Sequence, residues 1–390
     1  MEKLEVRHFG PIKELNIEIK LLTIFIGTQG SGKSTISKLL TICRDMHWYI
    51  NILEKENELK PFIDFNIDEY FQEDTYIHYQ HTGLDWEVEY NNGKFSIRIK
   101  DLSVERAKVM LNLYIKIANE NLLEYSLRQD DKDVRVEEFN TKLMKAGSRL
   151  MLYIPAERNL VGNLSSALAS IMLAQIPLSN TILEYMSLFE KAKKEFPLYK
   201  IPFLGVQFEK KEGKERIVLT GENKELPLNA CSSGLQSVIP MIMVIDYVLK
   251  VDCFNSFVIE EPEQNLFPDN QCALLDFISS KQGNQEYPQF VITTHSPYLL
   301  SYLNVLMFAY KLHNIKSIRE EVEKIVIPEI MINPEEVAVY GLNTTGDDYC
   351  KNLIAERTGL VSVNNLDSIS EFIGDEYEQL YRLYFKTKRK

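Results

Sequence analysis

The chain has 390 residues, of which 45% are hydrophobic and 26% charged, so it can bury a sizeable core and form more than one lobe. Its net charge of −12 argues against a uniformly basic nucleic-acid-binding surface, although a local basic groove is compatible with it. No apolar run reaches membrane-spanning length, and the five cysteines show no paired spacing. These features predict a cytoplasmic protein without disulfides and without a membrane partner.

The first stretch with a chemical signature is LLTIFIGTQGSGKSTISKLL, near the N-terminus. Residues 21–26 predict a buried strand, and the apolar spacing after Lys33 predicts a helix. Between them, the pattern Gly-x4-Gly-Lys-Ser predicts a phosphate-binding loop for a nucleotide such as ATP. Lys33 would reach the β- and γ-phosphates, and Ser34 would bind Mg²⁺. The expected nucleotide contacts in this loop are Gly27, Thr28, Gln29, Gly30, Ser31, Gly32, Lys33, Ser34 and Thr35.

A long and mixed segment follows the phosphate loop. Residues 64–100 are rich in aromatic and β-branched side chains and have a turn at NNGK, which predicts antiparallel strands. Residues 103–148 are charged and helix-permissive, and residues 164–196 have helical periodicity. We therefore expect an inserted β and helical region over 46–149, and a helical subdomain over 160–200.

The stretch LPLNACSSGLQS precedes a long apolar helix and places three small residues at its start, namely Ser232, Ser233 and Gly234. Hydroxyls and free N–H groups at a helix N-terminus can bind an anion. A plain N-cap is the alternative interpretation, because serine is a preferred capping residue.

The stretch FVIEEPEQNLFP ends an apolar strand in Glu260, Glu261 and Glu263. Crowded carboxylates repel one another, so the pattern indicates a nearby cation, the alternative being a strand that ends in an acidic surface turn. In phosphate-loop proteins a second strand delivers acids toward Mg²⁺ and the attacking water. Glu260 would then face Mg²⁺, and Glu261 would polarise the water. Aspartate is more usual at the first position, so the longer Glu260 leaves the metal geometry open.

A third stretch, FVITTHSPYLL, predicts a strand over 289–293 followed by His295. A histidine at such a strand end can hydrogen-bond the γ-phosphate or the attacking water, although a lone histidine is more often a surface residue. Helices are expected over 269–280 and 297–312, which continues an α/β pattern.

Taken in order, the phosphate loop, the Ser-Ser-Gly helix, the Glu-Glu strand and the Thr-Thr-His strand end resemble the ABC-type ATPases. VRHFGPIKEL and YIPAERN also fit the branch shared by SMC, RecF-like and overcoming-lysogenization-defect proteins, which are AAA-family ATP-binding proteins. The resemblance implies an α/β P-loop NTPase fold, with a mixed sheet flanked by helices and an ABC-type core over 1–45 and 150–312. Residues 313–390 would form a C-terminal α/β extension.

The same resemblance implies a homodimer that sandwiches two ATP molecules, with Ser232, Ser233 and Gly234 acting on the ATP of the other subunit. The signature reads CSSGLQ instead of Leu-Ser-Gly-Gly-Gln, and PAERN occupies the place of a Gln-loop, which makes Arg158 a candidate cofactor-binding residue. Two functions remain open. One is ATP-dependent gating of a separately encoded effector protein in prokaryotic anti-phage defence, and the other is clamping of DNA in repair or maintenance. The acidic balance and the absence of long coiled-coil arms favour the first.

Competing classes fit the sequence less well. A GTPase would need Asn-Lys-x-Asp, and NKEL lacks the aspartate. A AAA+ ring motor would place its acidic strand soon after the phosphate loop, whereas here Glu261 lies far downstream of Lys33. A fused C-terminal nuclease is disfavoured because no acid cluster follows strand ends after Leu312, and Asp347 and Asp348 read as a turn.

Overall fold

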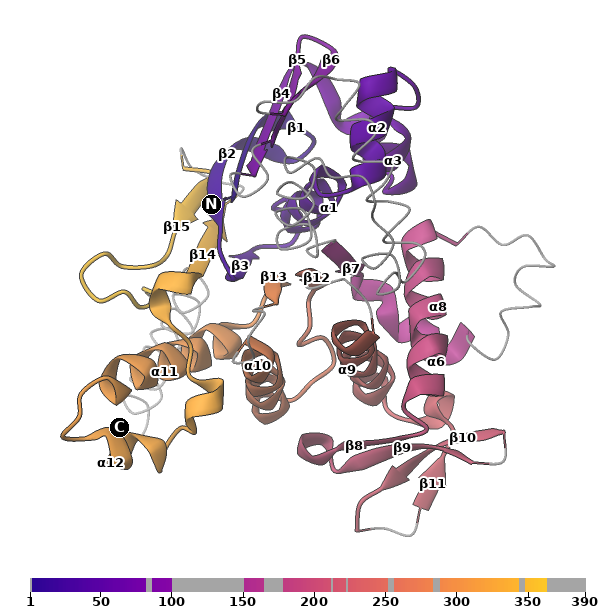
Figure 1. The fold of residues 1–390 in the computed structure, drawn as a ribbon, viewed down its shortest axis with the longest axis vertical. Helices are drawn as coiled ribbons and strands as arrows, with labels where there is room; N and C mark the ends of the chain where they lie inside the picture. Colours follow the sequence, from indigo (N-terminus) through magenta and orange to yellow (C-terminus); the bar gives the residue numbers. More distant parts are fainter. Residues whose placement is uncertain are drawn as a thin grey trace, which may run out of the picture.

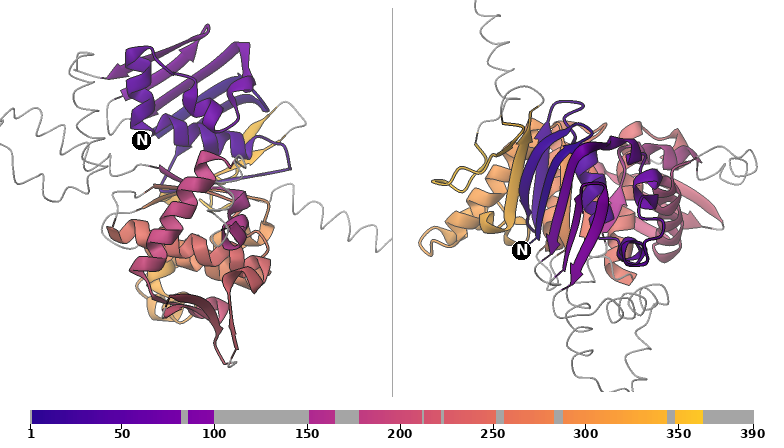
Figure 2. Two further views of the ribbon diagram at one scale, coloured as in Figure 1. Left: turned by 90° about the vertical axis from the view of Figure 1, so that its right-hand side faces the viewer. Right: turned by 90° about the horizontal axis from the view of Figure 1, so that it is seen from above.

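The computed structural model describes residues 2–81, 86–99, 151–164, 178–211, 213–221, 224–251, 256–282, 288–343 and 348–362. Within these residues the chain forms three sheets with helices packed between and around them (Figure 1). A six-stranded, mostly parallel sheet lies at the centre, a five-stranded antiparallel sheet at one end, and a four-stranded antiparallel sheet at the other (Figure 2). This architecture confirms the predicted α/β fold class with a mixed sheet flanked by helices.

The central sheet has the strand order β15-β14-β3-β13-β12-β7, in which all neighbours are parallel except β15 and β14. Its parallel strands are apolar runs of the kind that parallel sheets bury on both faces, whereas the antiparallel edge strand β15 is polar and partly exposed. They are β3 (Leu22–Gly27), β7 (Met151–Ile154), β12 (Ser256–Glu260), β13 (Gln289–Thr294), β14 (Val337–Leu342) and β15 (Cys350–Asn352). The predicted strands at 21–26, 257–259 and 289–293 are therefore present, and β14 and β15 come from the segment that was expected to form a C-terminal α/β extension.

The register of the parallel strands brings their carboxyl ends to one edge of the sheet. Glu260 on β12 pairs with Thr293 on β13, and Thr294 pairs with Ile26 on β3. Ligands of open α/β sheets bind outside this edge. The fold therefore brings the phosphate loop, the acidic turn and His295 to the same side of the sheet.

Side chains of β3 alternate between two cores, as the two-residue repeat of a strand requires. Leu22, Ile24 and Ile26 pack with the long helices, and Phe25 packs with α1 and the five-stranded sheet. The long helices are α8 (Asn180–Glu195), α9 (Ser233–Val251), α10 (Pro268–Gln282) and α11 (Pro297–His313), and α1 spans Lys33–Cys43. The shorter helices are α2 (Met46–Glu54), α3 (Lys60–Asp64), α6 (Leu160–Leu164) and α12 (Arg319–Glu323), with 3-10 turns η1 (Asp68–Tyr70), η3 (Ala156–Asn159), η4 (Pro202–Leu204), η5 (Leu228–Ala230), η6 (Pro328–Ile330) and η7 (Pro334–Glu336).

The five-stranded sheet joins the N-terminal hairpin to the region expected as an insertion. Its order is β2-β1-β4-β5-β6, so β4 pairs directly with β1. The strands are β1 (Glu2–Phe9), β2 (Ile12–Ile19), β4 (Phe71–His81), β5 (Trp86–Asn91) and β6 (Lys94–Ile99). The antiparallel strands expected within 64–100 are thus present, and their sheet crosses the predicted boundary at residue 45. Residues 103–148, where helices were expected, lie outside the described part of the chain, as do residues 165–177 and 363–390.

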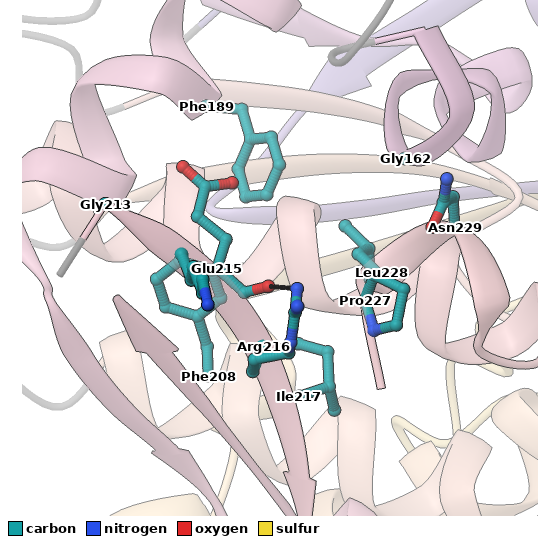
Figure 3. A pocket seen from close by; sticks show the side chains of 11 residues that line it. Gly162, Phe189, Phe208, Gly213, Glu215, Arg216, Ile217, Pro227, Leu228 and Asn229 are labelled. Carbon is teal, nitrogen blue, oxygen red and sulfur yellow. Dashed lines mark hydrogen bonds between the residues drawn. The ribbon is translucent and has the colours of Figure 1, made fainter. Parts of the chain in front are cut away.

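The four-stranded sheet, β8 (Leu198–Ile201), β9 (Val206–Lys211), β10 (Lys214–Leu219) and β11 (Lys224–Leu226), was not anticipated. A cavity of about 360 Å³ lies between this sheet and α8. Figure 3 shows the side chains that line it, among them Phe189, Phe208, Arg216 and Leu228. Lys33, Glu261 and His295 do not line the cavity, so it is separate from the predicted nucleotide site.

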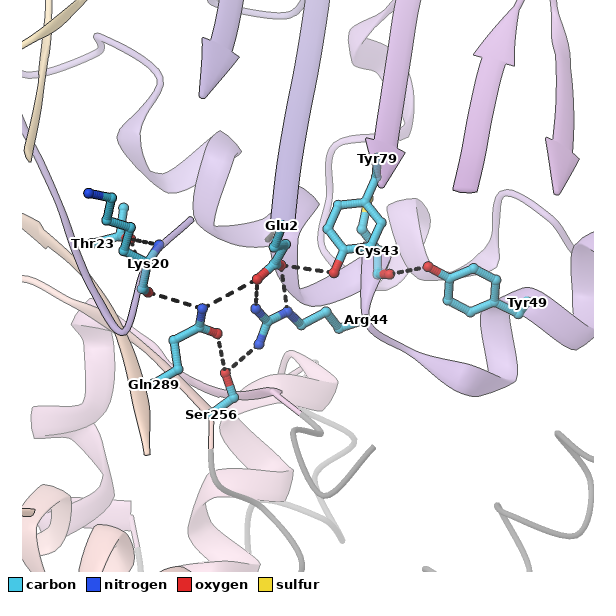
Figure 4. A network of polar contacts seen from close by, with 9 residues as sticks. All are labelled: Glu2, Lys20, Thr23, Cys43, Arg44, Tyr49, Tyr79, Ser256 and Gln289. Carbon is cyan, nitrogen blue, oxygen red and sulfur yellow. Dashed lines mark hydrogen bonds and ion pairs between the residues drawn. The ribbon is translucent and has the colours of Figure 1, made fainter. Parts of the chain in front are cut away.

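A buried polar network joins the five-stranded sheet to the central sheet (Figure 4). Glu2 on β1 pairs with Arg44 at the end of α1 and accepts a hydrogen bond of 2.8 Å from the Tyr79 hydroxyl. Arg44 also donates to Ser256, the first residue of β12, and Gln289 at the start of β13 donates to Glu2 at 3.3 Å. Every member is buried and paired, as a charged group in a core requires.

Helix α9 is long and apolar enough over Ser233–Lys250 to pass a composition test for a membrane span. In the structure 61% of that stretch is buried, and α9 packs against α8 in the large core. A core helix passes the same test, so this stretch gives weak support for a membrane span.

Candidate nucleotide-binding site

The phosphate loop lies where the sequence places it, between the end of β3 and the start of α1. Gly30 and Gly32 have φ angles of 75° and 92°, in the left-handed region that favours glycine. Gly32 is the N-cap of α1, and no side chain caps the helix. The N–H groups of the first helical turn are therefore left for an anion, which is the arrangement that binds phosphate.

Lys33 is the cation that the crowded carboxylates require. Its side chain is buried, and its Nζ donates to the carbonyls of Gly27 at 2.8 Å and Thr28 at 2.9 Å. Burial lowers the pKa of Lys33, while the charges of Glu261, Glu263 and Glu260 oppose that shift. The charges of the acidic stretch therefore act on the phosphate-loop lysine, so the stretch is not a plain surface turn.

Ser34 and Glu260, the two expected Mg²⁺ ligands, are neighbours in the structure. Burial raises the pKa of Glu260, and hydrogen bonds with Tyr153 and Ser34 partly offset that effect. Its Oε1 is buried without a hydrogen-bond partner in the described part of the chain. Among the described residues no group of three or more His, Cys, Asp or Glu side chains could hold a metal alone. A serine, one carboxylate and the phosphates of the substrate fit Mg²⁺, which keeps several of its waters.

Glu261 and His295 meet at the solvent edge of the site. The Nε2 atom of His295 lies 3.4 Å from Oε1 of Glu261, and each side chain is about one-third exposed. The hydrogen bond from His295 lowers the pKa of Glu261 despite partial burial, so this carboxylate stays ionised at neutral pH. The Glu261 backbone has a φ of 44°, and its N–H donates to the Thr293 carbonyl at 2.9 Å. An ionised carboxylate held in this way can orient an attacking water.

Glu263 has a position that the sequence did not reveal. Its Oε1 accepts hydrogen bonds from the Thr294 hydroxyl at 2.7 Å and from the His295 N–H at 2.9 Å. These bonds tie the acidic turn after β12 to the end of β13, and so fix His295 relative to Glu261. In the sequence, the only sign of this role was that Glu263 is a third acid next to Pro262 in the same short stretch.

Arg158 is hydrogen-bonded to backbone carbonyls at the acidic turn. The sequence predicts a cofactor-binding residue, whereas the structure buries the side chain completely. Its guanidinium donates to the backbone carbonyls of Glu260 at 2.5 Å and Glu261 at 2.6 Å, and to the Pro155 carbonyl at 3.1 Å. In this arrangement Arg158 holds the backbone of the two acids, and a contact with the nucleotide stays a prediction.

Ser232 and Ser233 are exposed at the start of α9. In the described part of the chain, no hydrogen bond or ion pair joins either serine to the phosphate loop of the same subunit. Gly234 is buried against the acidic turn, and a Cβ at this position would lie 2.6 Å from the Asn265 carbonyl oxygen. The structure thus brings the phosphate loop, Glu260, Glu261 and His295 together and leaves the two serines facing solvent.

Comparison with known proteins agrees with this geometry. The family described as "AAA ATPase domain" matches residues 1–300. The chain belongs to the AAA ATPase domain family. The match confirms the predicted kinship with P-loop ATPases, and such ATPases use ATP with Mg²⁺. No curated protein sequence matches the chain.

Solved structures similar to this AAA ATPase domain protein include three SMC head domains. An SMC head bound to the C-winged helix domain of ScpA is 13% identical with a TM-score of 0.42, covering 94% of this chain and 98% of that one. The SMC head domain from Thermotoga maritima is 12% identical with a TM-score of 0.39, covering 77% and 90%. An SMC head with an extended coiled coil, bound to the C-terminal domain of ScpA derived from Pyrococcus furiosus, is 12% identical with a TM-score of 0.42, covering 97% and 100%.

Proposed function

We propose that this AAA ATPase domain protein binds ATP with Mg²⁺ and hydrolyses it in an ABC-type cycle. The observation that carries the proposal is the convergence of Lys33, Glu260, Glu261 and His295 at one edge of the central sheet. Lys33 would exchange its two carbonyl partners for phosphate oxygens, and Glu261 would orient the attacking water. Ser34 and Glu260 would hold Mg²⁺, which neutralises negative charge on the phosphates.

The proposed cycle includes a head-to-head homodimer with two ATP molecules between the subunits. Ser232 and Ser233 are exposed at a helix start, so they are available to the ATP of a second subunit. Two large aromatic side chains are exposed beside the same site, Phe267 at 81% and Tyr298 at 56%. Phe267 follows the acidic turn and Tyr298 follows His295. Exposed aromatic side chains around a polar site are typical of a surface that becomes covered by a partner.

Two variants test the hydrolytic proposal. Glu261→Gln keeps the size of the side chain and removes its charge, so it should bind ATP with wild-type affinity, accumulate an ATP-bound dimer, and hydrolyse ATP at least about a hundredfold more slowly. Lys33→Ala should lose ATP affinity because the phosphates lose their buried cation. Equilibrium binding, steady-state hydrolysis and size-exclusion chromatography measure these effects. Wild-type turnover by Glu261→Gln would show that another group activates the water, and unchanged ATP affinity of Lys33→Ala would refute the site.

We further propose that ATP-dependent closure gates a separately encoded effector protein in the cytoplasm, in prokaryotic anti-phage defence. The acidic balance of the chain and the absence of sustained heptads support this proposal over a DNA clamp. Copurification of the ATP-bound Glu261→Gln protein with the product of a neighbouring gene would support it. Tight DNA binding by the dimer, falling steeply with salt, would instead support DNA clamping.

A further inference from the structure

The C-terminal hairpin of the described chain borders the phosphate loop. Strand β14 pairs in parallel with β3 along its whole length, ending at the pair Leu342 and Gly27. A Cβ on Gly27 would lie 2.4 Å from the Leu342 carbonyl oxygen, so the contact leaves no room for a side chain. The hairpin closes where the Asn343 N–H donates to the Tyr349 carbonyl at 2.9 Å. Residues that were expected to form a C-terminal extension therefore lie against the phosphate loop.

Tyr349 extends from this hairpin to the loop itself. Its side chain is 4% exposed, and its hydroxyl donates to the Ser31 carbonyl at 2.6 Å. Burial raises the pKa of Tyr349, so the phenol stays protonated and remains a donor. A Cβ on Gly32 would lie 2.5 Å from the Tyr349 hydroxyl oxygen, so the absence of a side chain there makes the close approach possible.

The hydrogen bond from Tyr349 also constrains the next N–H group. The peptide bond between Ser31 and Gly32 is planar and trans, because the chain has no cis peptide bonds in its described part. In a trans peptide the C=O and N–H bonds point in opposite directions. With the Ser31 carbonyl held against Tyr349, the Gly32 N–H therefore points from the opposite edge of the peptide unit, away from the Tyr349 hydroxyl.

We propose that Tyr349 is a positioning residue of the nucleotide site. Its hydroxyl fixes the Ser31–Gly32 peptide plane so that the Gly32 N–H is aimed at a bound phosphate, which makes the strand pair β14–β15 a working part of the site. The proposal rests on the proposed function, since it needs a nucleotide at Lys33. It adds a role for a residue that lies outside the phosphate-loop motif in the sequence.

The test compares Tyr349→Phe with a matched control on the same hairpin, Tyr340→Phe. Tyr340 is also buried, but its hydroxyl donates to the Glu18 carbonyl at 3.0 Å, away from the loop. Each variant removes one hydroxyl and keeps the ring. Losing one buried hydrogen bond should weaken binding of Mg²⁺-ATP about five- to tenfold in Tyr349→Phe only. The KM for ATP should rise by the same factor while kcat changes less than about twofold, because ground state and transition state lose the same contact.

Amide hydrogen exchange without nucleotide gives an independent readout. Exchange over residues 30–33 should become faster in Tyr349→Phe and stay at the wild-type rate in Tyr340→Phe. Equal nucleotide affinity and equal exchange in the two variants would overturn the role of Tyr349. A wild-type protein that binds no Mg²⁺-ATP would instead refute the proposed function, so the two failures are distinguishable.

Discussion

Lys33 shows how a single buried cation organises the residues around it. Taking an ammonium group out of water is costly unless charges of opposite sign compensate it. Here two backbone carbonyls and the acids of the turn after β12 provide that compensation. A phosphate would replace the carbonyls with stronger, charged acceptors. The carboxylates that looked unfavourable at the end of an apolar strand therefore favour the charged form of Lys33, against the effect of its burial.

Glu2 and Arg44 form a second buried pair whose importance can be measured. Burial raises the pKa of Glu2, but the charge and hydrogen bonds of Arg44 outweigh burial, so the pKa lies below its ordinary value. Glu2→Gln should lower the free energy of unfolding by about 3–5 kcal/mol at pH 7, because Arg44 is left as an uncompensated buried charge. Urea unfolding of both proteins measures this difference.

The sign of the pKa shift at Glu2 sets the pH range of this effect. A carboxylate with a depressed folded pKa stabilises the protein above its unfolded pKa and loses that contribution as pH falls through the folded pKa. The difference between wild type and Glu2→Gln should thus be constant from pH 7 to about pH 5 and shrink below that. Glu5→Gln is the matched control, because Glu5 lies on the same strand and pairs with the exposed Arg7. Its effect should stay within about 1 kcal/mol. Equal losses in the two variants would contradict the argument.

At the residue scale, the sequence predicted groups that lie within one continuous motif and missed those that depend on packing. The phosphate loop, Glu260, Glu261 and His295 follow strand ends, and parallel strands bring such ends together. Arg158, by contrast, reaches carbonyls about a hundred residues away, and Tyr349 reaches Ser31 over an even longer separation. Local sequence contains no signal for either contact.

Among the elements, the strands that the sequence predicted are long, continuous apolar runs, and most of the strands that it missed are short or mixed in polarity. β3, β12 and β13 are buried on both faces and read as apolar runs, so their position was predictable. β8 and β11 are short, partly exposed and mixed in polarity, so they are defined by their neighbours in the sheet. β14 is also a buried apolar strand, but the sequence does not show that it pairs with β3, which lies far away along the chain.

The close contact between α9 and the acidic turn makes a prediction at this scale. A Cβ on Gly234 would lie 2.6 Å from the Asn265 backbone oxygen, so Gly234→Ala must displace α9 or the turn that holds Glu261 and Glu263. We expect a loss of about 1–3 kcal/mol of stability from overpacking, together with a fall in kcat. The affinity for ATP at Lys33 should change less, because the phosphate loop lies on other elements.

Gly162→Ala is the control for Gly234→Ala. A Cβ on Gly162 would make an ordinary contact of 3.4 Å with Leu228, so this variant should melt and turn over like wild type. Thermal denaturation and steady-state ATP hydrolysis measure both properties. If Gly234→Ala behaves like Gly162→Ala, the turn tolerates displacement and does not couple α9 to the acids.

At the scale of the whole molecule, α1 connects two parts of the chain. Its N-terminus forms the phosphate site, and Arg44 at its other end enters the buried network with Glu2, Ser256 and Gln289 (Figure 4). The five-stranded sheet is thereby anchored to the starts of β12 and β13, whose opposite ends hold the acids and His295. Both strands are buried along their whole length, so the polar network and the acids lie at opposite ends of the same densely packed elements.

Because Ser232 and Ser233 are exposed, mutating Ser233 tests whether they act on ATP bound to a second subunit. Ser233→Arg places a bulky cation on an exposed position, so the subunit should melt like wild type and keep its ATP affinity at Lys33. If Ser233 contacts ATP across the interface, the variant should nevertheless fail to dimerise and to hydrolyse ATP. Lys33→Ala should also be inactive, for the separate reason that it does not bind the nucleotide.

Mixing the two inactive proteins distinguishes action across the interface from action within a subunit. In a symmetric dimer each composite site would combine the phosphate loop of one chain with the serines of the other. The mixed dimer then has one site with both mutations and one site with neither. Each mixed dimer has one working site of two, so mixing should restore hydrolysis, at about half the wild-type rate per mixed dimer. The rate of hydrolysis after mixing, measured against each variant alone, is the test. Wild-type hydrolysis by Ser233→Arg alone would show that the serines at the start of α9 are only a helix cap. If mixing restores no hydrolysis, the serines and Lys33 act in the site of the same subunit.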